Sequence, residues 1–157
     1  MTGGGDKNDN PACTLEPIEA VRLQQQTQLL TTAHRWLEAP ANTKVIARQV
    51  LLRGRYSSAI YAYAVSLVAP TRLPATLLRE LDTEPAGIGR VLLNSQIENR
   101  REILWYGYEH LTDLPEEINQ LMGDKFPSRT YRIIAGGQPV MLINEKFPMN
   151  TDDLLIE

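Results

Sequence analysis

Two charged side chains stand in rows of apolar residues, where a strand is expected to face the core. Successive side chains of a strand point to opposite faces of a sheet, so residues two apart share a face. One face of the predicted strand 44–53 reads Ile46, Arg48, Val50 and Leu52. One face of the predicted strand 139–147 reads Met141, Ile143, Glu145 and Phe147. Because a buried charge is costly unless it is paired, neutralised or bound to a ligand, Arg48 and Glu145 are the first candidates for a functional role.

Two interpretations of these charges are open from the residues alone. In the first, Arg48 and Glu145 pair with each other, or reach the edge of the sheet and place their charged ends in water. In the second, both face one pocket. Arg48 then binds a ligand carboxylate in a bidentate manner, and Glu145 binds or protonates a second oxygen function of the same ligand.

A glycine pair supplies the third candidate. Gly87 and Gly89 stand at the predicted start of a short helix, in the segment Gly87-Ile88-Gly89-Arg90. Without a Cβ atom at these positions, a ligand with several oxygen atoms can approach the backbone N–H groups closely. An ordinary turn would explain the same residues.

Composition excludes several classes of partner. The chain of 157 residues has a formal net charge of -3, which provides no basic field for a nucleic acid. Cys13 is the only cysteine, and His34 and His110 lie far apart, so we expect neither a disulfide nor a metal site. No apolar run approaches the roughly 18 residues that span a bilayer, so no membrane partner is expected. The first residues lack the apolar region of a signal peptide, which predicts a cytoplasmic protein.

The chain divides into a leader, one domain and a tail. Residues 1–16 are rich in Gly, Asp, Asn and Pro and are predicted to be a disordered leader. Residues 17–150 form the single predicted domain, and residues 151–157 a flexible tail. Within the domain, the apolar spacing predicts a helix from Pro17 to about Glu38, ended by Pro40.

The rest of the domain alternates between hairpins and short helices. Strands are predicted over 44–53 and 59–69, with a loop at 54–58, and short helices over 74–81 and 87–94. A strand over 97–108, a helix from Pro115 to Gly123 and a hairpin of 129–135 with 139–147 complete the order. Because hairpins pair antiparallel, the predicted class is α+β, an antiparallel sheet with helices packed on one side.

Five segments carry a family resemblance in the same order along the chain. They are ARQVLLRGR (47–55), SLVAPTRLP (66–74), GIGRVL (87–92), ENRREILWYG (98–107) and SRTYRIIAGGQPVMLINEKFP (128–148). Together they resemble the chorismate pyruvate-lyases, in the form of the cyanobacterial and mycobacterial branch, over about residues 44–148. The last segment is the most specific, since it joins a strand, a glycine turn and an acid followed by Lys-Phe-Pro.

The resemblance implies an enzyme that cleaves chorismate to 4-hydroxybenzoate and pyruvate without a metal or another cofactor. It places the carboxylate-binding arginine of the family at Arg48 and the catalytic acid at Glu145. The backbone contact to the ring hydroxyl falls on Ile88 and Gly89. The implied partner is a small-molecule substrate, and the implied fold is that of a chorismate lyase.

The N-terminal part departs from the family pattern. The segment TTAHRWLEAP (31–40) resembles the end of the family's first helix. The Gly/Ser-containing turn that follows this helix in the family is poorly retained, and few residues separate Pro40 from Val45. We therefore expect one strand and a covering flap to be shortened. The pocket would then be more open than in relatives, or completed by another chain, and the oligomeric state is not predicted. The alternative function is a non-catalytic lyase-like domain that binds a small aromatic carboxylate.

Overall fold

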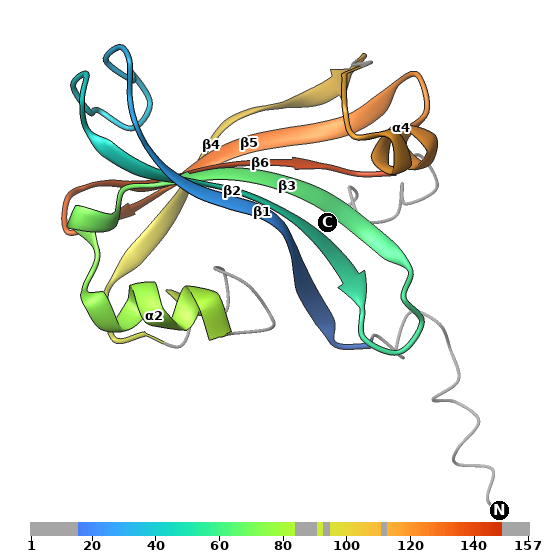
Figure 1. The fold of residues 1–157 in the computed structure, drawn as a ribbon, viewed down its shortest axis with the longest axis horizontal. Helices are drawn as coiled ribbons and strands as arrows, with labels where there is room; N and C mark the ends of the chain where they lie inside the picture. The colour runs from blue at the N-terminus through green and yellow to red at the C-terminus, as the bar shows by residue number, and fades with distance from the viewer. Residues whose placement is uncertain (1–15, 84–90, 93–94, 111–112, 149–157) are drawn as a thin grey trace, which may run out of the picture.

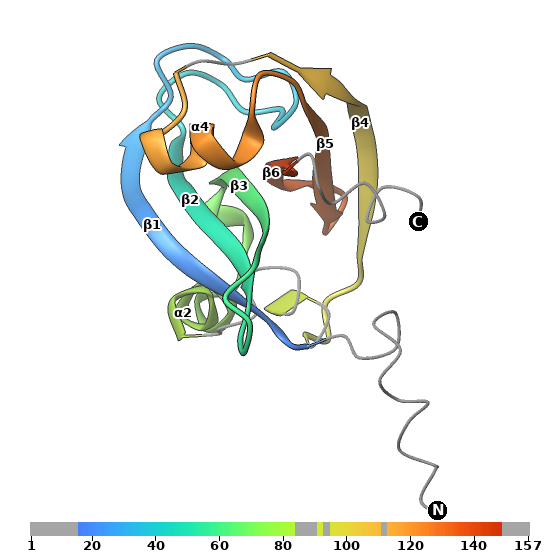
Figure 2. The same cartoon turned by 90° about the vertical axis from the view of Figure 1, so that its right-hand side faces the viewer.

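A single antiparallel sheet of six strands forms the body of the protein (Figure 1). The computed structural model describes residues 16–83, 91–92, 95–110 and 113–148. The strands are β1 (Ile18–Leu29), β2 (Lys44–Gly54), β3 (Ile60–Val68), β4 (Asn99–Glu109), β5 (Phe126–Ala135) and β6 (Gln138–Lys146), and the helices are η1 (Pro70–Arg72), α2 (Ala75–Thr83) and α4 (Glu116–Met122). The strand order is β1-β2-β3-β6-β5-β4, with β1 and β4 at the two edges. The sheet curves strongly, so that these edges lie on opposite sides of an open arch (Figure 2).

The predicted fold class is confirmed, since the sheet is antiparallel throughout and the helices lie against it. The second half of the chain follows the predicted order of strand, short helix and hairpin. The turn between β5 and β6 contains Gly136 and Gly137, whose φ angles are 65° and 81°. Glycine adopts this left-handed region without the steric penalty that other residues meet, which fits the predicted Gly-Gly turn.

The predicted helix over Pro17 to Glu38 is wrong. This segment contains β1, which pairs with β2 from Ile18 opposite Gly54 to Leu29 opposite Lys44. No residue of β1 is buried, so the apolar spacing that indicated a helix forms no core. Helix propensity is a weak preference, and the backbone hydrogen bonds available along β2 override it.

The helices cover both faces of the sheet rather than one side. α2 packs on Val68 and Met141 through Leu77 and Leu81, on the face we call the α2 face. α4 packs on Tyr63 and Phe126 through Ile118 and Met122. Because positions 63 and 68 of β3 have opposite parity, α4 lies on the other face, which we call the α4 face. The sequence identified both helices but carried no signal for the face on which each would pack.

The segment between β1 and β2, residues 30–43, folds onto the α4 face. Leu37 is fully buried there, in a cluster with Val45 and with the partly buried Leu67 and Leu142. Thus β1 directly precedes the strand of Arg48 in the chain, and residues 30–43 link the two strands.

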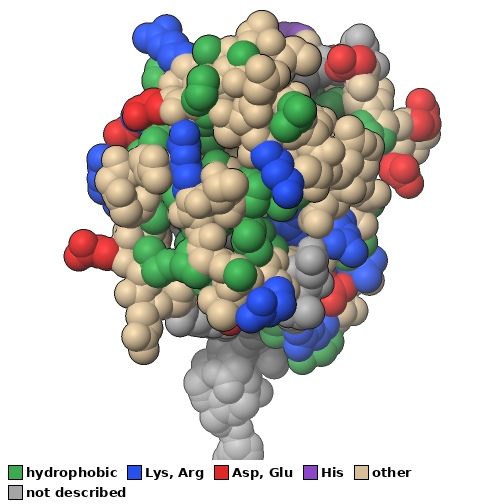
Figure 3. All heavy atoms as spheres, turned by 60° about the vertical axis from the view of Figure 1, so that its left-hand side comes forward, with side chains coloured by type: hydrophobic (Ala, Val, Ile, Leu, Met, Phe, Trp, Pro, Cys, Tyr) green, Lys and Arg blue, Asp and Glu red, His purple; other side chains and the backbone are tan. Residues whose placement is uncertain are grey.

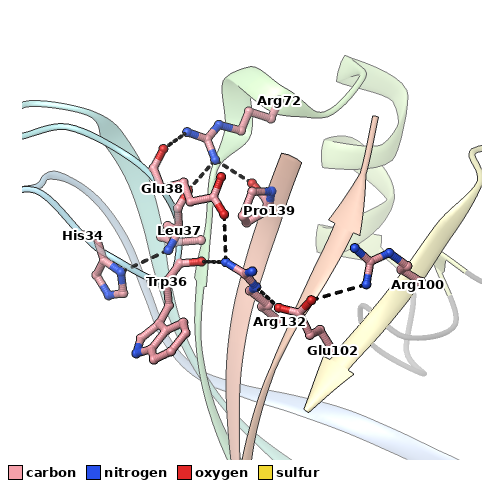
Figure 4. A network of polar contacts seen from close by, with 9 residues as sticks. All are labelled: His34, Trp36, Leu37, Glu38, Arg72, Arg100, Glu102, Arg132 and Pro139. Carbon is pink, nitrogen blue, oxygen red and sulfur yellow. Dashed lines mark hydrogen bonds and ion pairs between the residues drawn. The ribbon is translucent and has the colours of Figure 1, made fainter. Parts of the chain in front are cut away.

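Two arginines anchor this segment to the sheet (Figure 4). Nη1 of Arg72 donates to the backbone oxygens of Leu37 and Pro139, both at 2.6 Å, and its Nη2 donates to that of Glu38 at 2.9 Å. Arg132 donates through Nη1 to the Trp36 carbonyl at 2.9 Å and pairs with the Glu38 carboxylate at 3.2 Å. The backbone carbonyl groups of residues 36–38, which lie outside the strands, are therefore bonded by side chains instead.

Within residues 16–83, 91–92, 95–110 and 113–148, no helix is long and apolar enough to cross a membrane. In the same part of the chain, no group of three or more His, Cys, Asp or Glu side chains is placed to hold a metal ion.

Candidate functional site

Arg48 and Glu145 both lie on the α2 face, and both are buried. Arg48 stands opposite Ser66 of β3, and Glu145 stands opposite Ala64 of the same strand. Arg48 is 6% exposed and Glu145 is 8% exposed. The analysis of strand faces thus located two buried charges on one face, although β2 and β6 are far apart in the chain.

One strand, β3, separates the two residues. Neighbouring strands lie about 4.8 Å apart, so the backbones of β2 and β6 are about 10 Å apart at this point. Between them β3 contributes only the short side chains of Ala64 and Ser66, which are buried as well. A cationic group and an acidic group therefore flank a strip of small side chains. This strip was not recognised in the sequence, although alternating small residues in a strand would have indicated it.

The guanidinium of Arg48 lies under the end of α2. Its Nη2 donates to the backbone oxygen of Leu81 at 3.4 Å. On its other side, Gln25 of β1 stands directly opposite Arg48 in the strand register. Arg48 is thus enclosed by β1, β3 and α2, which fixes the direction in which its guanidinium can point.

Glu145 has two polar partners on the neighbouring strand β5. Its Oε1 accepts a hydrogen bond from Nε of Arg129 at 2.7 Å, and its Oε2 accepts one from the hydroxyl of Tyr131 at 3.2 Å. In the described part of the chain the ion pair of Glu145 is with Arg129 rather than with Arg48. The first interpretation of the sequence, a mutual pair between Arg48 and Glu145, therefore does not describe this carboxylate.

Tyr131 is held in its neutral form. Burial raises the pKa of its hydroxyl above the ordinary value of 10.0, and the nearby negative charge of Glu145 raises it further. Arg101 and Arg129 approach its ring at 5.0 and 5.6 Å, which is the range of cation–π contacts. Tyr131 therefore acts as a hydrogen-bond donor toward Glu145 over the whole neutral range of pH.

A polar cluster on the α4 face lies directly behind Glu145. Lys146 is 7% exposed, and its Nζ bonds to Glu109 at 3.1 Å and to the side-chain oxygen of Asn144 at 2.5 Å. The amide nitrogen of Asn144 donates to the hydroxyls of Ser128 and Thr130, both at 2.9 Å. Burial alone would raise the pKa of the Glu109 carboxyl, but hydrogen bonds from Ser128 and Lys146 lower it overall. These bonds connect Asn144 and Lys146, the two neighbours of Glu145 in β6, to Ser128 and Thr130, the two neighbours of Arg129 in β5.

Arg129 and Tyr131 were not identified from the sequence. They share one face of β5 with Ile133 and Ala135, which are buried. Arg129 is thus a charged residue at the end of an apolar row, the same signal that identified Arg48. The same reasoning could therefore have added Arg129 to the candidate residues, although not its pairing with Glu145.

Ile88 and Gly89, the predicted backbone contacts, lie outside the described residues. Val91, which directly follows Arg90, belongs to the buried cluster under α2, as does Leu81 of α2.

The hollows lined by residues that the structure describes include a small one near Arg48 and a larger one at the β5–β6 turn. One of about 190 Å³ lies next to Arg48 and is lined by Gln25, Ile46, Leu78, Arg79 and Leu81. A larger one of about 510 Å³ lies at the β5–β6 turn, between Asn99, Arg100, Ala135 and Gly136 among others. The larger hollow includes none of the predicted site residues, so its size does not make it the functional site. On the face toward the α2 end of the sheet, Lys and Arg side chains are interspersed with acidic and apolar ones (Figure 3).

Comparison with known sequences gives a consistent result. The sequence matches the family described as chorismate pyruvate-lyase Rv2949c-like over residues 12–155. A chorismate pyruvate-lyase of Mycobacterium tuberculosis (strain H37Rv) is 34% identical over 110 residues, which are 66% of this chain and 53% of that protein. A chorismate pyruvate-lyase of Mycobacterium leprae is 33% identical over 110 residues, 66% of this chain and 50% of that protein. The chain thus spans about half the length of these relatives.

Solved structures with the same fold are more distant in sequence. SA0254 of Staphylococcus aureus superimposes with a TM-score of 0.64 at 13% identity, covering 86% of each chain. The C-terminal domain of the histidine utilization repressor of Pseudomonas syringae has a TM-score of 0.59 at 12% identity, covering 85% of this chain and 92% of that one. At such low identity these likenesses show the fold alone.

Proposed function

The chain belongs to the Rv2949c-like chorismate pyruvate-lyase family, and from this premise we propose that it is a cofactor-free lyase that converts chorismate to 4-hydroxybenzoate and pyruvate. One observation carries the proposal. Arg48 and Glu145 are buried on one face of the sheet, on either side of the short side chains of β3. In this proposal, a six-membered ring with a carboxylate at one end and a hydroxyl at the other lies between these groups.

Arg48 binds the ring carboxylate in this proposal. A guanidinium presents parallel N–H donors that match the two oxygens of a carboxylate, and burial strengthens the pair because water competes less. The bond from Arg48 to the Leu81 carbonyl holds the guanidinium in place before the substrate arrives. Ile88 and Gly89 would contribute the backbone contacts near the ring hydroxyl.

Glu145 contacts the 4-hydroxyl of the ring and orients it. In the reaction, the C3–O bond breaks and its electron pair leaves with the oxygen of the three-carbon group. The hydrogen on C4 is lost as a proton, and a proton is gained by the methylene carbon of the leaving enolpyruvate, which becomes the methyl group of pyruvate. The ring becomes aromatic in the same process. Because the formation of an aromatic ring releases a large amount of free energy, orientation of the substrate and exclusion of water are the main tasks of the protein.

Incubation of the purified protein with chorismate tests the proposal, with 4-hydroxybenzoate and pyruvate followed by chromatography. We expect both products in equal amounts from the wild type. Glu145→Gln removes the carboxylate with little change in shape and should lower kcat by roughly a hundredfold. Arg48→Lys removes the bidentate geometry and should raise KM by about tenfold or more. Exposed controls of the same type, Glu98→Gln and Arg55→Lys, should leave both parameters within about twofold.

A second outcome would favour the alternative function. The chain spans about half the length of the curated relatives it matches. A domain that binds a small aromatic carboxylate without converting it is therefore a distinct candidate. Titration of the folded protein with 4-hydroxybenzoate separates the two. Binding that requires Arg48, without any product from chorismate, would identify a non-catalytic domain for small aromatic carboxylates. If neither binding nor turnover occurred, both functions would be refuted.

A further inference from the structure

A second cation lies at the Glu145 end of the candidate site. The guanidinium of Arg129 bonds Glu145 through Nε at 2.7 Å. Its side chain is 40% exposed, whereas that of Glu145 is 11% exposed. Arg129 therefore reaches from a buried acid toward the surface. A cation in this position does more than neutralise Glu145, because part of it remains accessible to a ligand.

The proposed substrate has two carboxylates, and Arg48 accounts for one. The second belongs to the three-carbon enolpyruvyl group on C3, the ring atom next to the C4 that bears the hydroxyl. If Glu145 contacts that hydroxyl, the enolpyruvyl group lies beside Glu145, at the end of the site opposite Arg48. We infer that Arg129 binds the enolpyruvyl carboxylate and so makes the site selective for a dianion. This inference rests on the proposed function.

The hydrogen bonds of Arg129 leave donors for such a ligand. A guanidinium has five N–H donors, and the bond to Glu145 uses the one on Nε. The rings of Tyr131 and Phe147 lie 5.6 and 5.5 Å from its central carbon and limit the orientations of its plane. The two terminal nitrogens can therefore present their N–H groups to a carboxylate in a fixed direction.

Charge balance supports the same assignment. The carboxylate of Glu145 is paired with Arg129, and a ligand carboxylate beside it would be repelled without a cation between the two. Arg129 provides that cation. Arg101 adds a second positive group 5.0 Å from the ring of Tyr131. The Glu145 end of the site can thus accept a negative charge that an isolated glutamate would exclude.

The same contact bears on bond breaking. As the C3–O bond breaks, its electron pair moves onto the oxygen of the leaving enolpyruvate, and this oxygen is bonded to the carbon that also bears the carboxylate held by Arg129. A guanidinium fixed beside this group stabilises the negative charge that develops there. After proton transfer to the methylene carbon, pyruvate leaves as a monoanion from the more exposed end of the site.

The test measures how one variant binds two ligands, 4-hydroxybenzoate with a single carboxylate and chorismate with two. Arg129→Gln removes the charge but keeps an N–H donor for Glu145. We expect KM for chorismate, and the Kd of chorismate measured by competition with 4-hydroxybenzoate, to rise by about tenfold or more. The Kd of 4-hydroxybenzoate, which has no second carboxylate, should change by less than about twofold. Arg129→Lys should recover part of the affinity for chorismate. Arg100→Gln, which removes an exposed charge from the α4 face, should match the wild type for both ligands.

The inference would be overturned if Arg129→Gln raised the Kd of both ligands by the same factor, since Arg129 would then act only by holding Glu145. It would also be overturned if chorismate binding did not change. Binding of 4-hydroxybenzoate by the variant shows that the site is still folded. Failure of the proposed function is seen separately, in a wild type that forms no product, and the comparison of the two affinities does not depend on turnover.

Discussion

At the scale of single residues, Tyr131 ties the acid of the candidate site to the core. Its ring is part of the cluster under α2, and its hydroxyl bonds Glu145 at 3.2 Å. Since burial raises the pKa of this hydroxyl above 10.0, the folded protein keeps the proton at a pH where the unfolded chain loses it. The stabilisation from this group is therefore fully present below about pH 10 and declines as the pH rises further.

Replacing Tyr131 by Phe should change the pH dependence of stability in a defined direction. The free energy of unfolding of the wild type should fall as the pH rises above about 10, and the fall should be shallower in Tyr131→Phe. At neutral pH the variant loses one hydrogen bond, which costs about 1 kcal/mol. Urea denaturation at each pH measures both effects. Tyr56→Phe, at a tyrosine that is 76% exposed, serves as the control. Parallel curves for wild type and Tyr131→Phe would contradict the assignment.

At the scale of elements, Arg72 holds residues 30–43 against the sheet. It bonds backbone oxygens of Leu37, Glu38 and Pro139, which belong to two separate segments of the chain. Removing it would leave carbonyl groups without these donors, next to the fully buried Leu37.

We expect Arg72→Met to lower the free energy of unfolding by about 2 kcal/mol, because hydrogen bonds from a charged donor contribute about 1.5–3 kcal/mol each and water replaces part of them. Arg100→Met removes an exposed pair with Glu102 at 3.4 Å and should change stability by less than about 0.5 kcal/mol. Urea unfolding of the two variants provides the comparison. Equal effects of both changes would show that residues 30–43 do not depend on Arg72.

The elements also show which parts of the structure the sequence could predict. Strand periodicity placed Arg48 and Glu145 on one buried face because β2 and β6 lie in the interior of the sheet, with a paired strand on each side. β1 was predicted as a helix because an exposed edge strand has no buried face to impose a period of two. The pairing of Glu145 with Arg129 could not be derived either, since it depends on the register between β5 and β6.

At the scale of the whole molecule, one sheet separates two cores. The cluster under α2 contains Met141, and the cluster under α4 contains Met122. Both methionines are fully buried. Because the same strands supply side chains to both clusters, loss of packing on either face weakens the structure on the other. The molecule should therefore unfold as one unit.

The two cores can be tested with matched substitutions. Met122→Ala and Met141→Ala should each lower the free energy of unfolding by about 2–5 kcal/mol, since each removes a fully buried side chain. In both variants the transitions followed by circular dichroism and by tryptophan fluorescence should coincide, because Trp36 and Trp105 lie on different elements of one cooperative unit. An early separate transition in Met122→Ala would show instead that the α4 side unfolds independently.

The place of β3 in the strand order has a consequence for how the protein reaches its native fold. The β2–β3 and β5–β6 hairpins each form from contacts near in sequence, whereas β3 and β6 join residues 63–68 to residues 141–146. Long-range pairing of this kind is slow, because the intervening chain loses conformational freedom before the contacts stabilise it. Arg48 belongs to the first hairpin and Glu145 to the second. A folding intermediate with both hairpins intact but undocked would contain both strands that bear these two residues and still lack the candidate site.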